Sequence, residues 1–276
     1  MNHITTIGID LAKSVFQICG LNQARKVAFN RAVKRSNLIS QIQRFPDAVI
    51  AMEACSSSHY WGREFGKLGY TVRLIPAQHV KALSRGNKND AQDALAIAEA
   101  VFRPNIHDVV PKTLEQQDIQ TLLRIRSRHQ ETRVSNSNQI RGLLSEYGLI
   151  IPVGNAALRG HLPEILEDAQ NTLTPIARSA IHQLYLEYLH QSELVKQYDR
   201  QLSRMANTYP LVKQLLRLRG IGPITAMALY ASIGNASQFK NARQLAAWIG
   251  PVSYTHLRAH ETNESIAYAV FCLKRG

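Results

Sequence analysis

Residues 89–101 read NDAQDALAIAEAV, a stretch that predicts a helix with Asp90 and Asp93 in its first turn. At about 100° per residue, both acids fall on the same stripe as Ala94 and Ile97, the stripe expected to face a core. Acids in a first helical turn are more often solvated or placed there by the helix dipole. We nevertheless expect both carboxylates to face inward, because earlier segments of the chain supply two further acids, Asp10 and Glu53, that are expected to lie near them.

The chain before residue 89 predicts strands and helices in a definite order. Strands are expected at residues 4–11, 15–19, 26–33, 48–54 and 70–75. The first helix is expected to be capped by Ser36 and closed by Pro46, the second to end at Gly69, and a third to follow Pro76. The order β-β-β-α-β-α-β-α matches the α/β ribonuclease-H-like fold, whose first and fourth strands lie side by side at the centre of the sheet.

Four acids are expected to converge where those two central strands end. Asp10 follows the first strand, Glu53 lies in the fourth, and Asp90 and Asp93 come from the helix. Carboxylates a few ångströms apart repel by about 4 kcal/mol per close ionised pair at an effective dielectric constant near 20, so a cation is expected among them. Oxygen ligands without His or Cys suit Mg²⁺ or Mn²⁺, and two such ions clamp the attacking and leaving oxygens of a phosphodiester. The four acids are therefore the candidate catalytic and metal-binding residues.

The composition favours a polyanionic partner. Lys and Arg outnumber Asp and Glu by 33 to 20, which gives a net charge of +13 and a pI near 9.9. This charge does not separate DNA, RNA and an anionic membrane surface. No apolar run of about 18 residues and no signal-peptide layout occurs, so we expect a cytoplasmic protein without a membrane partner. The three cysteines are scattered, which predicts neither a disulfide framework nor a zinc site.

Long helices are expected beyond Arg103. Residues 112–147 predict one and residues 176–205 a second, and the two would form an antiparallel hairpin or a dimer seam. Residues 150–173, which contain prolines and glycines, predict a loop or linker between them. The candidate nucleic-acid contacts on the first long helix are Arg124, Arg126 and Arg128. A basic helix face is, however, more often only solvated.

Residues 215–231, LLRLRGIGPITAMALYA, predict two apolar helices joined by a glycine turn. The pattern resembles a helix-hairpin-helix, in which glycines let backbone N–H groups approach a phosphate. An ordinary turn between two helices explains it equally well. The candidate phosphate contacts around this turn are Lys213, Arg217, Arg219, Gly220 and Gly222.

Three motifs carry a resemblance to a known family: Gly8-Ile9-Asp10, Met52-Glu53-Ala54 and the string KNDAQDA at residues 88–94. They are similar to the D, E, D and D motifs of bacterial insertion-sequence transposases of family one hundred and ten, which includes the pilin-gene invertases. The resemblance runs from about residue 3 to residue 250. It implies that the four acids bind catalytic metal ions, that DNA is the substrate, that a guide (bridge) RNA pairs with the DNA, and that the long helices help to assemble a homo-oligomer.

The C-terminal part departs from that family. The family places a nucleophilic serine in a Ser- and Gly-rich stretch after a Trp-x-Gly turn, which here is Trp248-Ile249-Gly250. Ser253 comes too early, so no serine nucleophile is identified, and VSYTHLRAHET resembles a translated sequencing adapter. The expected parts are a ribonuclease-H-like DEDD catalytic domain (1–108), a long helical, coiled-coil-like linker region (109–208), a truncated helical transposase domain (209–250) and a non-native tail (251–276).

Three alternatives accompany the main prediction of a Mg²⁺-dependent DNA transposase or site-specific recombinase. A resolvase-type nuclease would use water as its nucleophile and need no serine. An actin-like sugar kinase shares the β-β-β-α core, and residues 8–14 resemble its first phosphate loop, but the sequence has no second Asp-Gly-Gly loop. A truncated chain would bind nucleic acid and metal without completing recombination.

Overall fold

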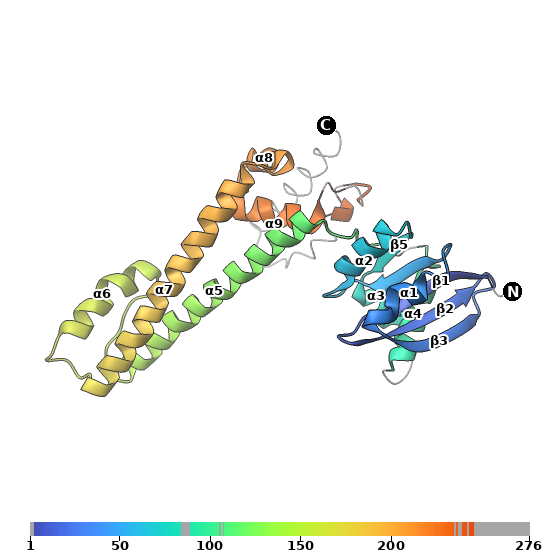
Figure 1. Cartoon of the computed structure of the whole chain (residues 1–276). Coiled ribbons are helices and arrows are strands. Elements are labelled where there is room, and N and C mark those ends of the chain that lie inside the picture. The colour runs from blue at the N-terminus through green and yellow to red at the C-terminus, as the bar shows by residue number, and fades with distance from the viewer. Residues whose placement is uncertain are drawn as a thin grey trace. The chain divides into compact units, whose positions relative to one another are not determined.

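A computed structural model describes residues 3–83, 89–104, 106, 108–234, 236, 239–241 and 243–245. The chain divides into two compact units: the first extends to Leu114 and also includes Ala236–Gln244, and the second begins at Glu115. Figure 1 shows the first unit as a sheet with helices and the second as a set of helices. No helix in these residues is both long and apolar enough to cross a lipid bilayer.

A five-stranded mixed sheet forms the centre of the first unit, in the order β3-β2-β1-β4-β5. The strands are β1 (Ile4–Asp10), β2 (Val15–Asn22), β3 (Val27–Lys34), β4 (Val49–Glu53) and β5 (Val72–Ile75). β1 pairs antiparallel with β2 and parallel with β4, so the first and fourth strands lie side by side as predicted. The α/β class is confirmed for this unit, and the sheet is compatible with a ribonuclease-H-like fold.

Helices cover both faces of the sheet. They are η1 (Arg35–Asn37), α1 (Leu38–Ile42), α2 (Ser58–Lys67), α3 (Ala77–Leu83) and α4 (Asp90–Ala100). On one face Phe16, Trp61 and Phe65 belong to the main hydrophobic core, whereas α3 and α4 pack on the other face. The prediction that Ser36 caps α1 is wrong: Asn37 is the N-cap residue, and Ser36 lies within η1, where its hydroxyl bonds to the Asn37 side chain.

Small residues bring α4 unusually close to the central strand. Ala94 and Ala98 are buried against β1, where the sequence has Gly8. A Cβ atom at Gly8 would lie 2.3 Å from the Ala94 carbonyl oxygen and 2.6 Å from the Ala98 nitrogen. Because both are backbone atoms, they cannot move aside without moving the helix. Glycine at position 8 is therefore a steric requirement of the packing of α4.

The second unit is built on two long antiparallel helices. Its helices are α5 (Leu114–Ser145), α6 (Asn155–Glu167), α7 (Pro175–Ala206), α8 (Pro210–Leu216) and α9 (Pro223–Ile233). Arg126 of α5 forms an ion pair with Asp199 of α7, whereas Ile140 further along α5 packs in one cluster with Ile181, nearer the start of α7. The two predicted long helices and their antiparallel hairpin are thus confirmed, and their coiled-coil character stays a prediction.

The prediction of a loop between the long helices is wrong, because α6 occupies 13 of those residues. Leu158 and Leu162, one turn apart, are fully buried in the cluster with Tyr188. Pro163 lies inside the helix and cannot donate the usual backbone bond. The burial of the leucines outweighs this cost, and Arg178 satisfies the end of α6 by donating to the carbonyls of Ile165 and Leu166.

We predict that Gly8→Ala destabilises the protein by about 1–3 kcal/mol, the usual cost of overpacking a tight core contact. Urea denaturation followed by circular dichroism measures the effect. Gly66→Ala is the matched control, because Gly66 lies in α2 and nothing is within 4 Å of the added Cβ. That change should stabilise α2 by up to about 1 kcal/mol. Equal urea midpoints for the two variants would show that α4 does not depend on Gly8.

Candidate metal site and nucleic-acid surface

Asp10 and Glu53 end the two parallel central strands. The register pairs Gly8 with Ala51 and Ile9 with Met52, so the side chains of the next residues, Asp10 and Glu53, lie at neighbouring positions. Both residues are half-buried. Both charges also act on Cys55, whose pKa is raised mainly by burial and further by the carboxylates of Glu53 and Asp10. The structure therefore brings two of the four predicted acids together.

These two acids lie on the sheet face that α4 covers. Gly8 and Ala51, two residues earlier on the same strands, both contact α4, and side chains alternate between faces along a strand. Ile97 of α4 packs in one cluster with Ile75, and Ile75 is the β5 partner of Glu53. Asp93 lies about one helical turn before Ile97 and is half-buried. Asp93 is therefore on the flank of α4 that faces the Asp10–Glu53 edge.

Asp90 does not share this environment. It is exposed, whereas Ala94 and Ile97 on the predicted stripe are buried. The Asn89 side chain caps α4 by accepting a bond from the Ala91 nitrogen at 2.9 Å, and Asn30 of β3 donates to the Ala91 carbonyl at 2.7 Å. This second bond holds the first turn near β3, which β2 separates from β1. The prediction that both acids face inward is thus wrong for Asp90.

The chemistry of the donor set fits a hard divalent cation. The acids offer carboxylate oxygens, the ligands that Mg²⁺ and Mn²⁺ favour. In the part of the chain that the structure describes, no three His, Cys, Asp or Glu side chains lie close enough together to hold one ion. Asp10 and Glu53 are the adjacent pair, and Asp93 comes from the facing flank of α4.

The predicted glycine turn joins α8 to α9. Gly220 has a φ of 88°, in the left-handed region that favours glycine, and Gly222 is the N-cap residue of α9. Ile221 between them is buried and anchors the turn. The candidate phosphate contacts are all exposed: Lys213, Arg217, Arg219, Gly220 and Gly222. The turn thus presents three cations to solvent, while its assignment as a helix-hairpin-helix stays a prediction.

Contacts of Tyr230 hold α9 against the start of α5. Its hydroxyl donates to Glu115 at 3.0 Å, and its carbonyl accepts from the Gln116 side chain at 3.0 Å. The ring lies 5.1 Å from that of Tyr209. Burial, followed by the bond to Glu115 and its charge, raises the pKa of Tyr230 to about 12. As a neutral phenol, Tyr230 thus links α9, which follows the glycine turn, to the start of α5.

The three arginines predicted on α5 differ in their surroundings. Arg124 and Arg128 are exposed and available for a phosphate. Arg126 is half-buried, and its Nε donates to Asp199 at 2.5 Å, so its charge is already paired across the hairpin. Arg126 therefore stabilises the α5–α7 pair. Residues 248–250, Ser253 and the rest of the predicted tail lie outside the described residues.

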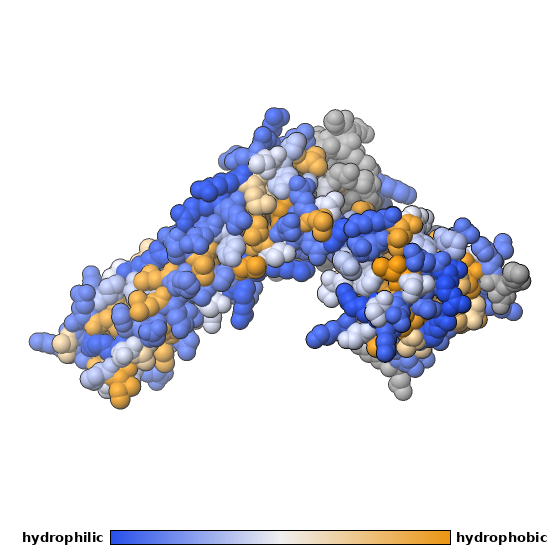
Figure 2. Space-filling model, in the orientation of Figure 1, coloured by the Kyte–Doolittle hydropathy of each residue, from blue (hydrophilic) through white to orange (hydrophobic). Residues whose placement is uncertain are grey.

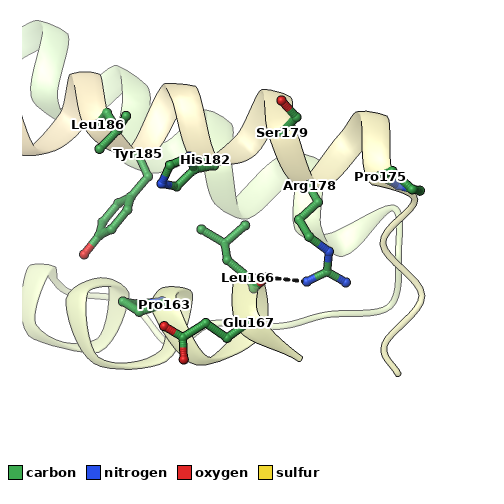
Figure 3. Close-up of a pocket in the computed structure, with 9 residues that line it drawn as sticks. All are labelled: Pro163, Leu166, Glu167, Pro175, Arg178, Ser179, His182, Tyr185 and Leu186. Carbon is green, nitrogen blue, oxygen red and sulfur yellow. Dashed lines mark hydrogen bonds between the residues drawn. The ribbon is translucent and has the colours of Figure 1, made fainter. Parts of the chain in front are cut away.

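A pocket of about 510 Å³ lies between the end of α6 and the start of α7 (Figure 3). In Figure 3, a dashed line joins Arg178 to the Leu166 carbonyl, a bond of 2.6 Å within the pocket lining. The lining residues are Pro163, Leu166, Glu167, Pro175, Arg178, Ser179, His182, Tyr185 and Leu186. None of the predicted site residues is among them. The predicted chemistry therefore does not use this pocket.

Comparison with known proteins identifies the family. Residues 7–149 match a family model for DEDD transposases of the IS110 type, and residues 212–257 match the model described as "Transposase IS116/IS110/IS902 family". The transposase for insertion sequence element IS1111A from Coxiella burnetii is 40% identical over 93% of this chain and 70% of its own length. A probable family 20 transposase from Pseudomonas aeruginosa is 39% identical over 92% of this chain and 75% of its own length.

A more distant relative is the pilin gene-inverting protein of Moraxella bovis, which is 21% identical over 89% of this chain and 71% of its own length. The sheet topology and these matches define a DNA transposase and recombinase of the DEDD class. Within that class, the chain belongs to the IS110 family of insertion-sequence transposases. The predicted family and its activity in DNA transposition are confirmed, and the DEDD class implies a divalent metal ion.

We predict that the stability contributed by Tyr230 falls as the pH rises from 10 to 12. The ordinary pKa of tyrosine is about 10, so in this window the unfolded state loses the phenol proton while the folded state keeps it. Wild type should therefore lose more stability than Tyr230→Phe as the pH rises through this window, measured by urea denaturation at pH 10, 11 and about 12. Tyr60→Phe, at an exposed tyrosine of the first unit, is the control. Parallel losses in wild type and Tyr230→Phe would contradict the role given to the phenol.

Proposed function

We propose that the chain catalyses transposition by a Mg²⁺-dependent reaction at DNA phosphodiesters, with Asp10, Glu53, Asp90 and Asp93 as the metal-binding residues; Mn²⁺ is the alternative ion. The observation that carries the proposal is the adjacent placement of Asp10 and Glu53 at the ends of β1 and β4, facing the flank of α4 that bears Asp93. When bound, the ions stabilise the charge on the attacking and leaving oxygens of the phosphodiester.

The residues around the ends of β1 and β4 favour the binding of a cation there. Two neighbouring carboxylates repel each other and favour any positive charge between them. Cys55, which lies beside them, adds no further negative charge at neutral pH, because the ordinary pKa of a thiol already lies above neutral and burial raises that of Cys55 further. Asp10 and Glu53 are held by the strands, and Asp93 by a helix that is packed against Gly8. Rigid strands and a buried helix suit ligands that must keep fixed positions.

Binding of the DNA backbone falls to basic residues elsewhere in the chain. A carboxylate cluster repels a polyanion, so attraction must come from cations such as Arg124, Arg128 and those of the glycine turn. At the turn, Gly220 and Gly222 leave the backbone without side chains where α9 begins. A phosphate can therefore approach backbone N–H groups there, with Arg217 and Arg219 beside it.

We extend the proposal to partners and domain organisation. Residues 1–108 would form the catalytic domain, 109–208 the linker region and 209–250 the C-terminal transposase domain. Family resemblance supports a guide RNA and a homo-oligomer. Figure 2 shows hydrophobic surface along the helical unit and at its end. Between the end of α5 and the start of α7, Ile150, Val153 and Ile176 are 74%, 94% and 83% exposed, which is unusual for large apolar side chains and suits contact with another copy.

We predict that Asp10→Asn and Asp93→Asn each lower metal-supported DNA cleavage at least a hundredfold and leave DNA affinity within about twofold, because the basic surfaces are unchanged. Cleavage of a plasmid carrying the element's ends, with Mg²⁺ titrated, measures the first effect, and filter binding in EDTA the second. Asp47→Asn removes an exposed acid of the same unit and is the matched control. Cleavage at the wild-type rate by Asp10→Asn would refute the metal site.

We predict that Arg217→Ala and Arg219→Ala each weaken DNA binding for all sequences and reduce the slope of log K against log [salt] by about 1. Fluorescence anisotropy with a labelled duplex at several salt concentrations measures the slope. Arg200→Ala is the control, because Arg200 is also exposed but donates to Glu193 at 2.6 Å. An unchanged slope in both turn variants would exclude the glycine turn from the DNA interface.

A further inference from the structure

Two side-chain amides connect the sheet to the first turn of α4. The Gln17 Nε2 of β2 donates to the Asn30 Oδ1 of β3 at 2.7 Å, and the Asn30 Nδ2 donates to the Ala91 carbonyl at 2.7 Å. A backbone carbonyl only accepts, so Asn30 must turn its NH₂ group toward Ala91 and its oxygen toward Gln17. The two bonds therefore support one orientation of the Asn30 amide.

This amide pair starts beside one predicted metal ligand and ends beside others. Gln17 is the cross-strand partner of Asp10 in the β1–β2 pair, and partners in that position share a sheet face. Asn30 pairs with Cys19, which in turn pairs with Gly8 beneath α4. Ala91 lies between Asp90 and Asp93 in the first turn of the helix. The pair thus spans the distance between the strand that bears Asp10 and the turn that bears Asp93.

The rest of α4 is held by other contacts. Its middle packs on Gly8 through Ala94 and Ala98, and Arg73 of β5 donates to the Val101 carbonyl at its C-terminal end. Arg73 is itself fixed by two bonds to Asp108, at 2.7 and 3.0 Å. Loss of the Asn30 bond would therefore leave the middle and end of the helix docked and act on its first turn.

We propose that Asn30, oriented by Gln17, is a positioning residue that sets the place of the α4 first turn, and with it Asp93, relative to Asp10 and Glu53. The inference rests on the proposed role of these acids as metal ligands. Asn30 itself contributes no charge to the site. Its removal should weaken metal binding by loosening one ligand and should leave DNA binding unchanged.

The test is direct Mn²⁺ binding to the full chain without DNA, followed by the electron paramagnetic resonance signal of free Mn²⁺. Asn30→Ala is expected to raise the Kd about fivefold, the ratio that the loss of one net hydrogen bond implies. Gln17→Ala, which keeps the Asn30 donor but not its orientation, should give a smaller rise. Hydrogen–deuterium exchange of residues 90–94 should be faster in both, with less change in residues 95–100.

Asn22→Ala is the matched control. The Asn22 side chain accepts from the Lys26 nitrogen at 2.9 Å in the β2–β3 connection, so its loss weakens the same sheet without touching α4. Asn30→Ala with wild-type Mn²⁺ affinity and wild-type hydrogen–deuterium exchange would overturn the inference. Tighter Mn²⁺ binding by this variant would also overturn it, because the Asn30 bond would then hold Asp93 away from the site. If Asn30→Ala does not fold, Gln17→Ala decides by the same criteria.

A different variant tests the proposed metal site independently of the positioning role of Asn30. Asp10→Asn should abolish Mn²⁺ binding whether or not Asn30 positions the helix. Full Mn²⁺ binding by Asp10→Asn would refute the metal site itself, whereas its loss together with wild-type behaviour of Asn30→Ala would refute only the positioning role.

Discussion

The close approach of α4 to β1 is the contact on which the candidate site depends. Only glycine at position 8 leaves room for the Ala94 carbonyl and the Ala98 nitrogen, which lie within 2.6 Å of the place a Cβ atom would take. The same contact places the first turn of α4 over the sheet face that bears Asp10 and Glu53. A steric requirement at one residue thus determines how closely the helix that bears Asp93 packs on the strand that bears Asp10.

Basic and acidic residues of the chain have different roles: the first attract a polyanion, and the second form the acidic edge of the sheet. The net charge of +13 draws the protein to a polyanion, yet the sheet edge that carries Asp10 and Glu53 is acidic. Exposed arginines that lack an acidic partner suit phosphate binding, whereas Arg126 and Arg73 are paired with Asp199 and Asp108 and stabilise the fold. An arginine that is already paired gains less from a phosphate, because it must first lose its carboxylate.

Much of the fold was predictable from local sequence patterns. Alternating apolar residues predicted the strands, and the order of elements predicted that β1 and β4 are neighbours. Helix α6 was missed because Pro163 and the nearby glycines indicate a loop, while the burial of Leu158 and Leu162 depends on partners in α7. The exposure of Asp90 was missed because helical periodicity cannot include the bond from Asn30 to the Ala91 carbonyl, two residues that are 61 positions apart in the sequence. No sequence motif identifies Asn30 as a residue that contacts α4.

The two contacts that hold α4 on the sheet, its packing on Gly8 and its bond from Asn30, differ in strength. Ala94 and Ala98 are buried where they pack on Gly8, and the atoms that limit this approach are backbone atoms. This packing therefore determines the distance between α4 and the sheet. The Asn30 bond is exposed, and such a bond contributes only about 1 kcal/mol because water competes for both partners. The Asn30 contact is therefore weaker than the packing of the helix middle on Gly8. If the proposed metal site is correct, a cation shared by Asp93 and the strand acids would order the first turn of α4, and the Asn30 bond would reduce the cost of this ordering. Metal binding and the position of the turn would then be coupled.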